Sequence, residues 1–301
     1  MRWSGPAAAA RENGGAIVAL ESSVLAQGLV PPFNREAFER MSNAVVAAGA
    51  TPAVTAIDHG VPVMGLEGNA LERFLARDGV RKVSARDLAM AMADGADGAT
   101  TVAGTLALCV LGGVEVFATG GIGGVHRDAP FDESADLAEL ARSAAIVVCA
   151  GAKSILDLPA TLERLETLGV PVVGYRTREL PGFFTATTGL PLSAWVETPA
   201  QLARAWQAHR ELGRPGAMLV VQTPPHALDP RVVEEATAAA LAEASRHHVR
   251  GGAVTPFLLG EVQRRTHGAS VRVNLGLLES NARLAGQIAV ALAKLHAGKT
   301  H

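Results

Sequence analysis

Lysine is scarce in this chain, and two of its four lysines lie in the most motif-like segments. Of the 27 basic residues only Lys82, Lys153, Lys294 and Lys299 are lysines, and the last two lie near the C-terminus. An arginine guanidinium stays protonated in proteins, whereas a lysine ammonium can lose its proton and become a nucleophile. The pattern therefore indicates lysine chemistry at Lys82 or Lys153; chance placement in an arginine-rich chain is the alternative.

Lys153 follows an apolar run at residues 147–152 and precedes a helix-like pattern. At a helix N-terminus the macrodipole disfavours an ammonium, and partial burial acts in the same direction. We therefore expect a neutral, nucleophilic amine that attacks a carbonyl or a sugar C1. The alternative is a lysine that binds phosphate without covalent chemistry. A Walker A loop is excluded, because its upstream glycine and its Gly-Lys pair are both missing.

Glu21 stands where an apolar run ends, and two hydroxyl residues follow it. Polar groups beyond the carboxyl ends of strands are where ligands collect in open α/β sheets. We therefore predict that Glu21 is a catalytic acid. The alternative is a helix N-cap with an acidic first turn.

A glycine-rich segment at residues 118–127 has four glycines in five residues, followed by His126 and Arg127. Glycines let backbone N–H groups approach an anion closely, which favours a phosphate or sugar site over a plain turn. A dinucleotide fingerprint does not fit, because His126 stands where its last glycine is needed. Further along, Asp132 or Asp136 could hold a hard divalent ion together with water and phosphate oxygens, although exposed turn acids would look the same.

Short runs rich in Val and Ile alternate with helical patterns, which predicts a largely parallel or mixed sheet covered by helices. The expected strands are residues 16–20, 53–57, 114–119, 145–150, 170–175 and 218–222, with a small hairpin at 61–66. The expected helices are residues 35–48, 71–77, 85–93, 100–111, 137–142, 156–168, one from Pro199, 231–247, 255–266 and 271–296. Residues 178–196 are expected to form an irregular excursion or short strands before the helix from Pro199.

Composition limits the classes of protein to consider. The chain has 301 residues, 49% of them hydrophobic, and a net charge of −2 with mixed signs, so we expect no nucleic-acid or membrane partner. We expect a frayed tail at residues 1–15, without a secretory signal, and one domain at residues 16–301. Cys109 and Cys149 lie in apolar runs, as buried reduced thiols of a cytoplasmic protein would. His and Cys spacing predicts no zinc-type site.

Six ordered motifs together resemble the pseudouridine-5′-phosphate glycosidase family. They are ALESS at residues 19–23, KVSARDL at 82–88, GATTVA at 98–103, TGGIGGVHR at 119–127, FDESADL at 131–137 and CAGAKSILDL at 149–158. The likeness covers residues 17–292 and includes Gly174-Tyr175, TPFLL at 255–259 and Asn274. The resemblance implies a three-layer α/β/α sandwich and a homotrimer.

The resemblance also implies a reaction: reversible cleavage of the C–C glycosidic bond of pseudouridine 5′-phosphate to uracil and ribose 5-phosphate, with Mn²⁺ or a similar divalent ion. It implies that Lys153 attacks C1′ of the ribose to give an imine, that Glu21 is the proton donor, and that Lys82 contacts substrate and helps proton movement at the base. Asp132 matches the metal ligand of the family. The other matching substrate contacts are Val102, Thr119, His126, Ser134, Ala135, Asp136 and Asn274.

The sequence departs from the family pattern at two places: residue 23 is Ser where Thr is frequent, and the loop between His126 and Asp132 is short and contains Pro130. Both departures affect the expected metal or phosphate geometry. Two other functions are the alternatives: a non-catalytic phosphosugar or nucleotide sensor, and a ribokinase-like sugar kinase. The kinase is disfavoured because the chain has no Gly-Ala-Gly-Asp run near its C-terminus.

Overall fold

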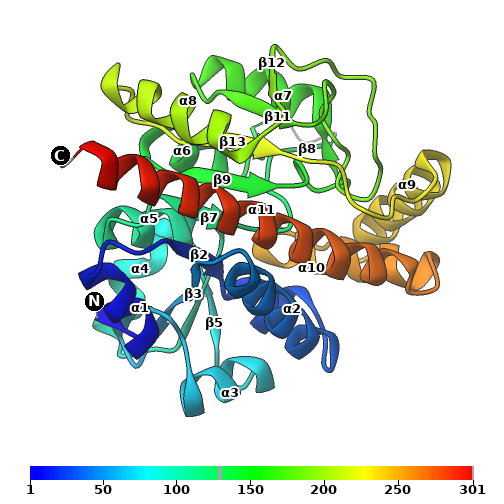
Figure 1. Cartoon of the computed structure of the whole chain (residues 1–301). Helices are drawn as coiled ribbons and strands as arrows, with labels where there is room; N and C mark the ends of the chain where they lie inside the picture. The colour runs from blue at the N-terminus through cyan, green and yellow to red at the C-terminus, as the bar shows by residue number, and fades with distance from the viewer. Residues whose placement is uncertain (128–130, 300–301) are drawn as a thin grey trace.

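The computed structural model describes residues 1–127 and 131–299, which form a central sheet covered on both faces by helices (Figure 1). Runs of Val, Ile, Leu and Ala make its middle strands, because residues buried on both faces of a parallel sheet must be apolar throughout. These strands are β2 (Ile17–Glu21), β3 (Thr51–Asp58), β7 (Val116–Ala118), β9 (Ile146–Cys149), β11 (Val172–Tyr175) and β13 (Met218–Val221). All six lie where the sequence predicts strands.

The sheet has eleven strands, in the order β1-β4-β3-β2-β7-β9-β13-β11-β12, with β6 and then β5 attached to β3. Neighbours from β3 to β12 are parallel, while β4 and β6 run antiparallel to β3. The shorter strands are β1 (Arg2–Trp3), β4 (Val61–Met64), β5 (Arg81–Val83), β6 (Gly98–Thr100) and β12 (Ala194–Val196). A separate antiparallel pair joins β8 (Val125–His126) to β10 (Leu156–Asp157).

Two helical layers complete a three-layer sandwich, as the sequence predicts. One face carries α2 (Phe33–Ala47), α8 (Pro199–Glu211) and the long α11 (Ala269–Lys299), which crosses the front of the sheet in Figure 1. The other face carries α5 (Val102–Gly112) and α6 (Ala135–Arg142), with α7 (Leu158–Thr167) beside α6. The remaining helical segments are α1 (Gly5–Glu12), α3 (Gly68–Ala76), α4 (Leu88–Ala93), α9 (Pro230–Arg246), α10 (Val254–Arg265), η1 (Val24–Gly28), η2 (Ala85–Asp87) and η3 (Gly251–Ala253).

The N-terminus differs from the prediction of a frayed tail. Residues 2–3 pair in parallel with β4, and α1 follows at once. The Ser4 side chain caps α1 by accepting from the Ala7 N–H, Pro6 occupies the first turn, and Ala7 is fully buried in the core. A cap residue followed by Pro is a helix start signal. The alanine-rich run at residues 7–10 is therefore a packed helix.

The predicted hairpin at residues 61–66 is also placed differently. Only one of its strands, β4, lies in that range, and its antiparallel partner is β3, joined through a turn at His59 and Gly60. Both residues of this turn have positive φ, as a two-residue hairpin turn of type I′ requires. The hairpin is therefore formed by residues 51–64.

Both cysteines are free and buried, as predicted, and burial raises the pKa of each thiol to about 12. Neither thiol is poised to act as a nucleophile, because the thiolate is the reactive form. Among the helices of the described residues, none is long and apolar enough to cross a membrane.

Candidate active site

A cavity of about 510 Å³ opens beyond the carboxyl ends of the central strands. It is walled by the ends of β2 and β5, the starts of α5 and α6, the segments after β7 and β9, η3 with the first turn of α10, and one face of α11. Ten of the residues predicted as catalytic, substrate-binding or metal-binding line it: Glu21, Lys82, Val102, His126, Asp132, Ser134, Ala135, Asp136, Lys153 and Asn274. The structure thus gathers side chains that are up to 253 positions apart in the sequence, from residue 21 to residue 274.

Glu21 is the last residue of β2 and only 8% exposed. Its Oε1 accepts a 2.5 Å hydrogen bond from Thr119 Oγ1, and its Oε2 accepts a 2.8 Å bond from Ser23 Oγ. Burial raises the pKa of Glu21 above its ordinary value, against the opposing effects of the Lys153 charge and of these two hydrogen bonds. A carboxyl group that holds its proton more tightly than usual suits the role of a proton donor.

Thr119 is placed differently from the prediction of a substrate contact. It is 1% exposed and lies behind the cavity wall, so its hydroxyl reaches Glu21 and not the cavity. Its position directly after β7, which is parallel to β2, explains the contact, because the carboxyl ends of parallel neighbours lie side by side.

Lys153 reaches the cavity, but it does not begin a helix as the sequence predicts. Residues 152–157 first form a bridge from Ala152 to Ile122 and then strand β10, so α7 begins only at Leu158. The expected macrodipole effect on Lys153 therefore does not apply. Instead, the part-buried side chain donates from Nζ to the carbonyl oxygen of Gly121 at 2.8 Å, which fixes the amine at the cavity wall.

Lys82 is the central residue of β5, and its side chain is solvent-accessible through the cavity. The cavity walls nevertheless exclude much of the water around the ammonium, and this desolvation lowers the pKa of Lys82. The nearby Lys153 charge lowers it further. Asp136 and Glu21 oppose it. Lys82 therefore releases a proton more readily than an ordinary surface lysine does.

Most backbone amides in the glycine segment are already bonded within the protein. Ile122 N donates to Gly151 O at 3.1 Å, Gly123 N to Asp136 Oδ2 at 2.8 Å, and Val125 N to Thr161 Oγ1 at 3.0 Å. None of its four glycines has a φ in the left-handed region. These glycines serve close packing: a Cβ at Gly121 would lie 2.7 Å from Phe183 Cδ2 and 2.9 Å from Gly151 O.

Asp136 joins two walls of the cavity. Its Oδ1 accepts from the Ala103 N–H at 3.0 Å and its Oδ2 from Gly123, so one buried carboxylate ties the start of α5 to the glycine segment. The first residues of α5 and α6, Val102 and Ala135, both line the cavity. Two helix N-termini therefore meet at this wall, and the Ala103 amide at the start of α5 already binds one anionic group, the Asp136 carboxylate.

Asp132 is exposed at the rim of the cavity, and its carbonyl oxygen accepts from the His126 N–H at 3.0 Å. A free carboxylate beside an open cavity fits a hard cation that keeps water molecules and takes further oxygens from a bound phosphosugar. It does not fit a cation held by an all-protein cage. Pro130, which the sequence marks as a departure in this loop, lies outside the described residues.

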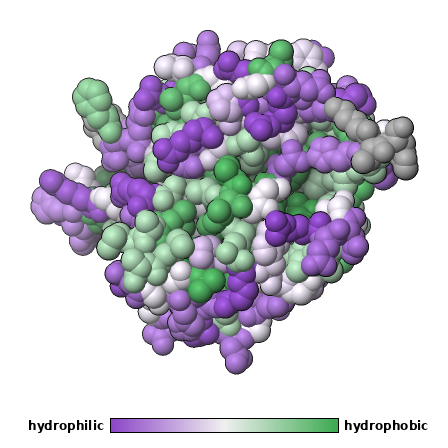
Figure 2. Space-filling view, turned by 90° about the vertical axis from the view of Figure 1, so that its left-hand side faces the viewer, coloured by the Kyte–Doolittle hydropathy of each residue, from purple (hydrophilic) through white to green (hydrophobic). Residues whose placement is uncertain are grey.

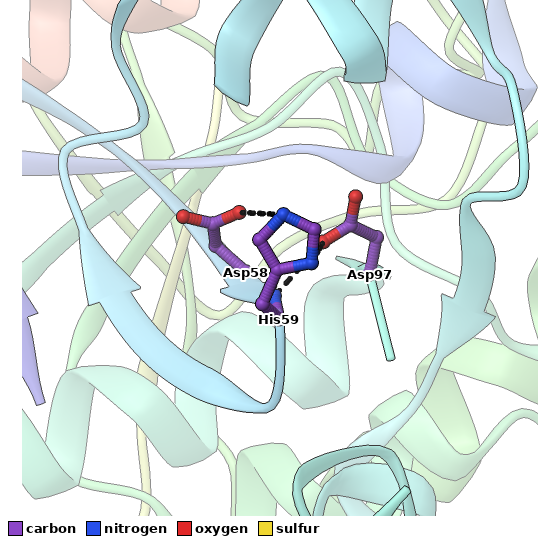
Figure 3. A group of neighbouring side chains, drawn as sticks. All are labelled: Asp58, His59 and Asp97. Carbon is purple, nitrogen blue, oxygen red and sulfur yellow. Dashed lines mark hydrogen bonds and ion pairs between the residues drawn. The ribbon is translucent and has the colours of Figure 1, made fainter. Parts of the chain in front are cut away.

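A different group of side chains, Asp58, His59 and Asp97, brings three possible ligand atoms within 4.8 Å of one another (Figure 3). Both carboxylates are already paired: Asp58 with Arg2 and Arg73, and Asp97 with Arg73 Nε at 3.0 Å. Because two guanidinium groups neutralise two carboxylates, a cation would have to displace them. This cluster anchors Arg2 and the β3–β4 turn, away from the cavity.

A cluster of buried hydroxyl groups, which the sequence does not predict, lies next to Glu21. Ser22 Oγ accepts from the Thr100 N–H at 2.9 Å, and the hydroxyls of Thr55, Thr100 and Thr105 are hydrogen-bonded to one another at 2.8–3.0 Å. All four residues are fully buried. The cluster fixes the end of β2 against β6 and α5, and so positions Glu21. Only the threonines of the GATTVA motif signal it in the sequence.

A model of the indigoidine synthase A-like protein family matches residues 7–291. The chain belongs to this family. A protein of Gemmatimonas aurantiaca named pseudouridine-5′-phosphate glycosidase is 70% identical over 285 residues, 94% of this chain and 93% of its own length. Proteins of the same name from Herpetosiphon aurantiacus and Staphylococcus aureus are 52% and 45% identical, covering 94% and 95% of this chain and 95% and 94% of their own lengths. The predicted resemblance, and with it the prediction of an enzyme, is confirmed.

Two solved structures share the fold. The prealnumycin C-glycosynthase AlnA, in complex with ribulose 5-phosphate, is 38% identical with a TM-score of 0.91, over 99% of this chain and 98% of its own. An indigoidine synthase A-like protein from Thermotoga maritima is 36% identical with a TM-score of 0.87, over 93% of this chain and 94% of its own.

Proposed function

We propose that this protein cleaves the C–C glycosidic bond of pseudouridine 5′-phosphate reversibly, giving uracil and ribose 5-phosphate. The observation that carries the proposal is the arrangement of Glu21 and Lys153 at one cavity wall. Two residues of one loop segment hold both groups, Thr119 the carboxyl group and Gly121 the amine. A buried carboxyl and a fixed amine are the two groups that opening a ribose ring requires.

In the first step, the neutral amine of Lys153 forms a bond to C1′, the C1′–O4′ bond breaks, and O4′ takes a proton from Glu21. The nitrogen, an ammonium after its attack on C1′, returns a proton to the Glu21 carboxylate and so regains its lone pair. In the second step, C5 of uracil takes a proton from the Lys82 ammonium while the C1′–C5 bond breaks, and the nitrogen lone pair forms the C=N bond of a protonated imine. Water then hydrolyses the imine, which releases ribose 5-phosphate and restores the amine. The imine keeps one N–H, and the Gly121 carbonyl is placed to accept it.

The other cavity residues have supporting roles in this proposal. Lys82, with its lowered pKa, moves the proton at the base. The phosphate lies at the starts of α5 and α6, where Val102, Ser134 and Ala135 line the wall, while His126, Asp136 and Asn274 complete the pocket. Asp132 holds Mn²⁺ or a similar divalent ion, which neutralises charge on substrate oxygens. AlnA supports this reading, since its name denotes C-glycoside chemistry and it binds an open-chain pentose phosphate.

We also propose a cytoplasmic homotrimer. Large apolar side chains are exposed on two neighbouring elements, Met90 and Met92 on α4 and Val110 and Leu111 on α5. Figure 2 shows an apolar area near the centre of the face that carries these helices. Apolar patches of this kind mark interaction surfaces. Analytical ultracentrifugation tests this proposal, because a monomer at micromolar concentration would contradict it.

Chromatographic measurement of free uracil tests the proposed activity. The purified protein is incubated with pseudouridine 5′-phosphate and Mn²⁺, with EDTA added to a parallel sample. We expect uracil release that EDTA abolishes. Tight binding without release from the folded, metal-loaded protein would instead support the phosphosugar sensor, and ATP consumption with a sugar substrate would support a kinase.

A further inference from the structure

Asn281 is a buried amide on α11 whose hydrogen bonds reach the segment after β7. It is 1% exposed; its Nδ2 donates to Thr119 O at 2.8 Å and Gly120 O at 3.4 Å, and its Oδ1 accepts from Gln222 Nε2 at 2.9 Å. Carbonyl oxygens can only accept, so the two carbonyls fix which end of the amide faces them. Gln222 follows β13, and its own N–H donates to Cys149 O at 3.1 Å.

The peptide that Asn281 holds carries the partners of both proposed catalytic groups. Thr119 gives its carbonyl to Asn281 and its hydroxyl to Glu21. Two residues later, the Gly121 carbonyl accepts from Lys153 Nζ. A displacement of this three-residue segment would therefore move the hydrogen-bond partners of the carboxyl group and of the amine together.

Close packing makes α11 the natural anchor for this segment. A Cβ at Gly120 would lie 3.3 Å from Leu277 Cδ1 and from Leu278 Cδ2, and 3.4 Å from Asn274 Oδ1. The backbone of the segment thus rests directly on the helix. Asn274, which lines the cavity, and Asn281 are seven residues apart, two turns of the same helix face.

We propose that Asn281 is a positioning residue, which aligns Glu21 and Lys153 with each other by holding the Thr119 and Gly120 carbonyls. The inference deepens the proposed function and rests on it for its kinetic consequences. Asn281 does not line the cavity and acts only through the loop.

Replacement of the Asn281 amide tests this role. Asn281→Asp keeps the shape but turns an acceptor toward two carbonyl oxygens, and Asn281→Leu removes the hydrogen bonds. Because a displacement of about 1 Å can cost about 100-fold in rate, we expect kcat for uracil release to fall by about 10- to 100-fold, with KM within about threefold of wild type. Gln222→Leu, which removes only the hydrogen bond to Asn281 Oδ1, should have a smaller effect.

Ile288→Ala is the matched control, since Ile288 is fully buried on the same helix about 10 Å further along. It loosens α11 without touching a hydrogen bond to the loop, so kcat and the pH–rate profile should match wild type. In Asn281→Asp the pH–rate profile should move, because the Thr119 hydroxyl, whose hydrogen bond lowers the pKa of Glu21, is displaced. If Asn281 only stabilised the fold, the Asn281→Asp molecules that fold would show the wild-type pH–rate profile.

A second readout is independent of substrate. The rate at which an acetylating reagent labels Lys153 is measured by mass spectrometry, with the exposed Lys294 as internal reference. Loss of the Gly121 anchor should speed labelling of Lys153 by about threefold or more in Asn281→Asp, and not in Ile288→Ala. Wild-type labelling in folded Asn281→Asp would overturn the inference whatever its kcat. If the wild-type protein does not release uracil, the proposed function is wrong. The labelling rates of Lys153 in wild type and Asn281→Asp would still test whether Asn281 positions the loop.

Discussion

Thr119 Oγ1 lies 2.5 Å from Glu21 Oε1 and donates to it in a buried site. The hydrogen bond favours the ionised carboxylate, whereas burial favours the protonated acid. Burial is the larger effect, so the pKa of Glu21 is raised. The Lys153 charge and, after it, the Thr119 hydrogen bond therefore limit how far burial raises the pKa of this proton donor.

Thr119→Val removes this hydroxyl while keeping the shape of the side chain. Without the bond, burial raises the pKa of Glu21 further, so the limb of the pH–rate profile that reports this acid should move to higher pH. Thr237→Val is the matched control, because Thr237 is fully buried on α9 and its hydroxyl has no partner among the described residues. A profile unchanged in Thr119→Val would show that the hydroxyl does not tune Glu21.

Glu21→Gln should separate activity from stability. Loss of a general acid typically costs about 10²- to 10⁴-fold in rate. Below pH 4.5, the ordinary pKa of Glu, the Glu21 carboxyl group is protonated in both the folded and the unfolded wild type. Its burial then does not cost the free energy of removing a charge from water. As pH rises through the raised folded pKa, wild type loses stability that the neutral glutamine keeps.

Thermal unfolding of both proteins across pH 4–9 measures this difference. The melting temperature of Glu21→Gln should exceed that of wild type at pH 8, and the difference should shrink toward pH 4.5. A difference that grows toward low pH would contradict the raised pKa.

Lys153 variants separate a nucleophile from a positive charge. Lys153→Ala and Lys153→Arg should both abolish uracil release, because arginine keeps the charge but does not form the imine. Folding should persist, since this part-buried side chain has one hydrogen bond in the structure, to Gly121 O. Borohydride with ribose 5-phosphate should add a reduced sugar adduct to wild type and to neither variant. Normal turnover in Lys153→Arg would exclude the imine.

The middle of the fold is predictable because it is encoded locally. Each apolar run between helical patterns buries both faces of a parallel strand, and β2, β9 and β13 need no information beyond their own residues. The sequence does not predict strands β5 and β6, because each has only three residues. A segment that short shows no alternation of apolar and polar residues, and the central residue of β5 is the charged Lys82. The sequence does not predict the N-terminal helix, because its apolar run is only four alanines long. The one local sign of the helix is its start, where Ser4 and Gly5 precede a proline.

The sequence predicts most of the residues that line the cavity, but it does not predict the hydrogen bonds that hold them in place. The motifs name Glu21 and Lys153, but the segment around Lys153 pairs with Ile122 instead of starting a helix, and that pairing is non-local. In the same way, Asn281 contacts a residue 162 positions away. Such hydrogen bonds depend on how α11 crosses the sheet, which no local pattern reports.

Asp132→Asn tests the proposed cation site. Loss of the carboxylate should raise the Mn²⁺ concentration needed for half-maximal activity by about 10-fold or more, since hard cations prefer ionised oxygen ligands. Glu133→Gln is the neighbouring control: this acid lines the same rim but is paired with Arg164 Nε at 2.9 Å. Equal Mn²⁺ requirements in Asp132→Asn and wild type would place the ion elsewhere.

Gly123→Ala tests whether the glycine segment is required for close packing. The new Cβ would lie 2.9 Å from Asp136 Oδ2 and still closer to the Ser134 side chain, at the wall where α5 and α6 begin. The Gly123–Asp136 hydrogen bond should break, so KM for the phosphosugar should rise and kcat should fall. Gly276→Ala on α11 is the control, because its Cβ would meet nothing closer than 3.7 Å. Alanine is favoured over glycine inside a helix by about 1 kcal/mol, so Gly276→Ala should melt at or above the wild-type temperature with unchanged kinetics. If Gly123→Ala also has unchanged kinetics, the side chains of Ser134 and Asp136 can shift to accommodate the new methyl group without loss of activity.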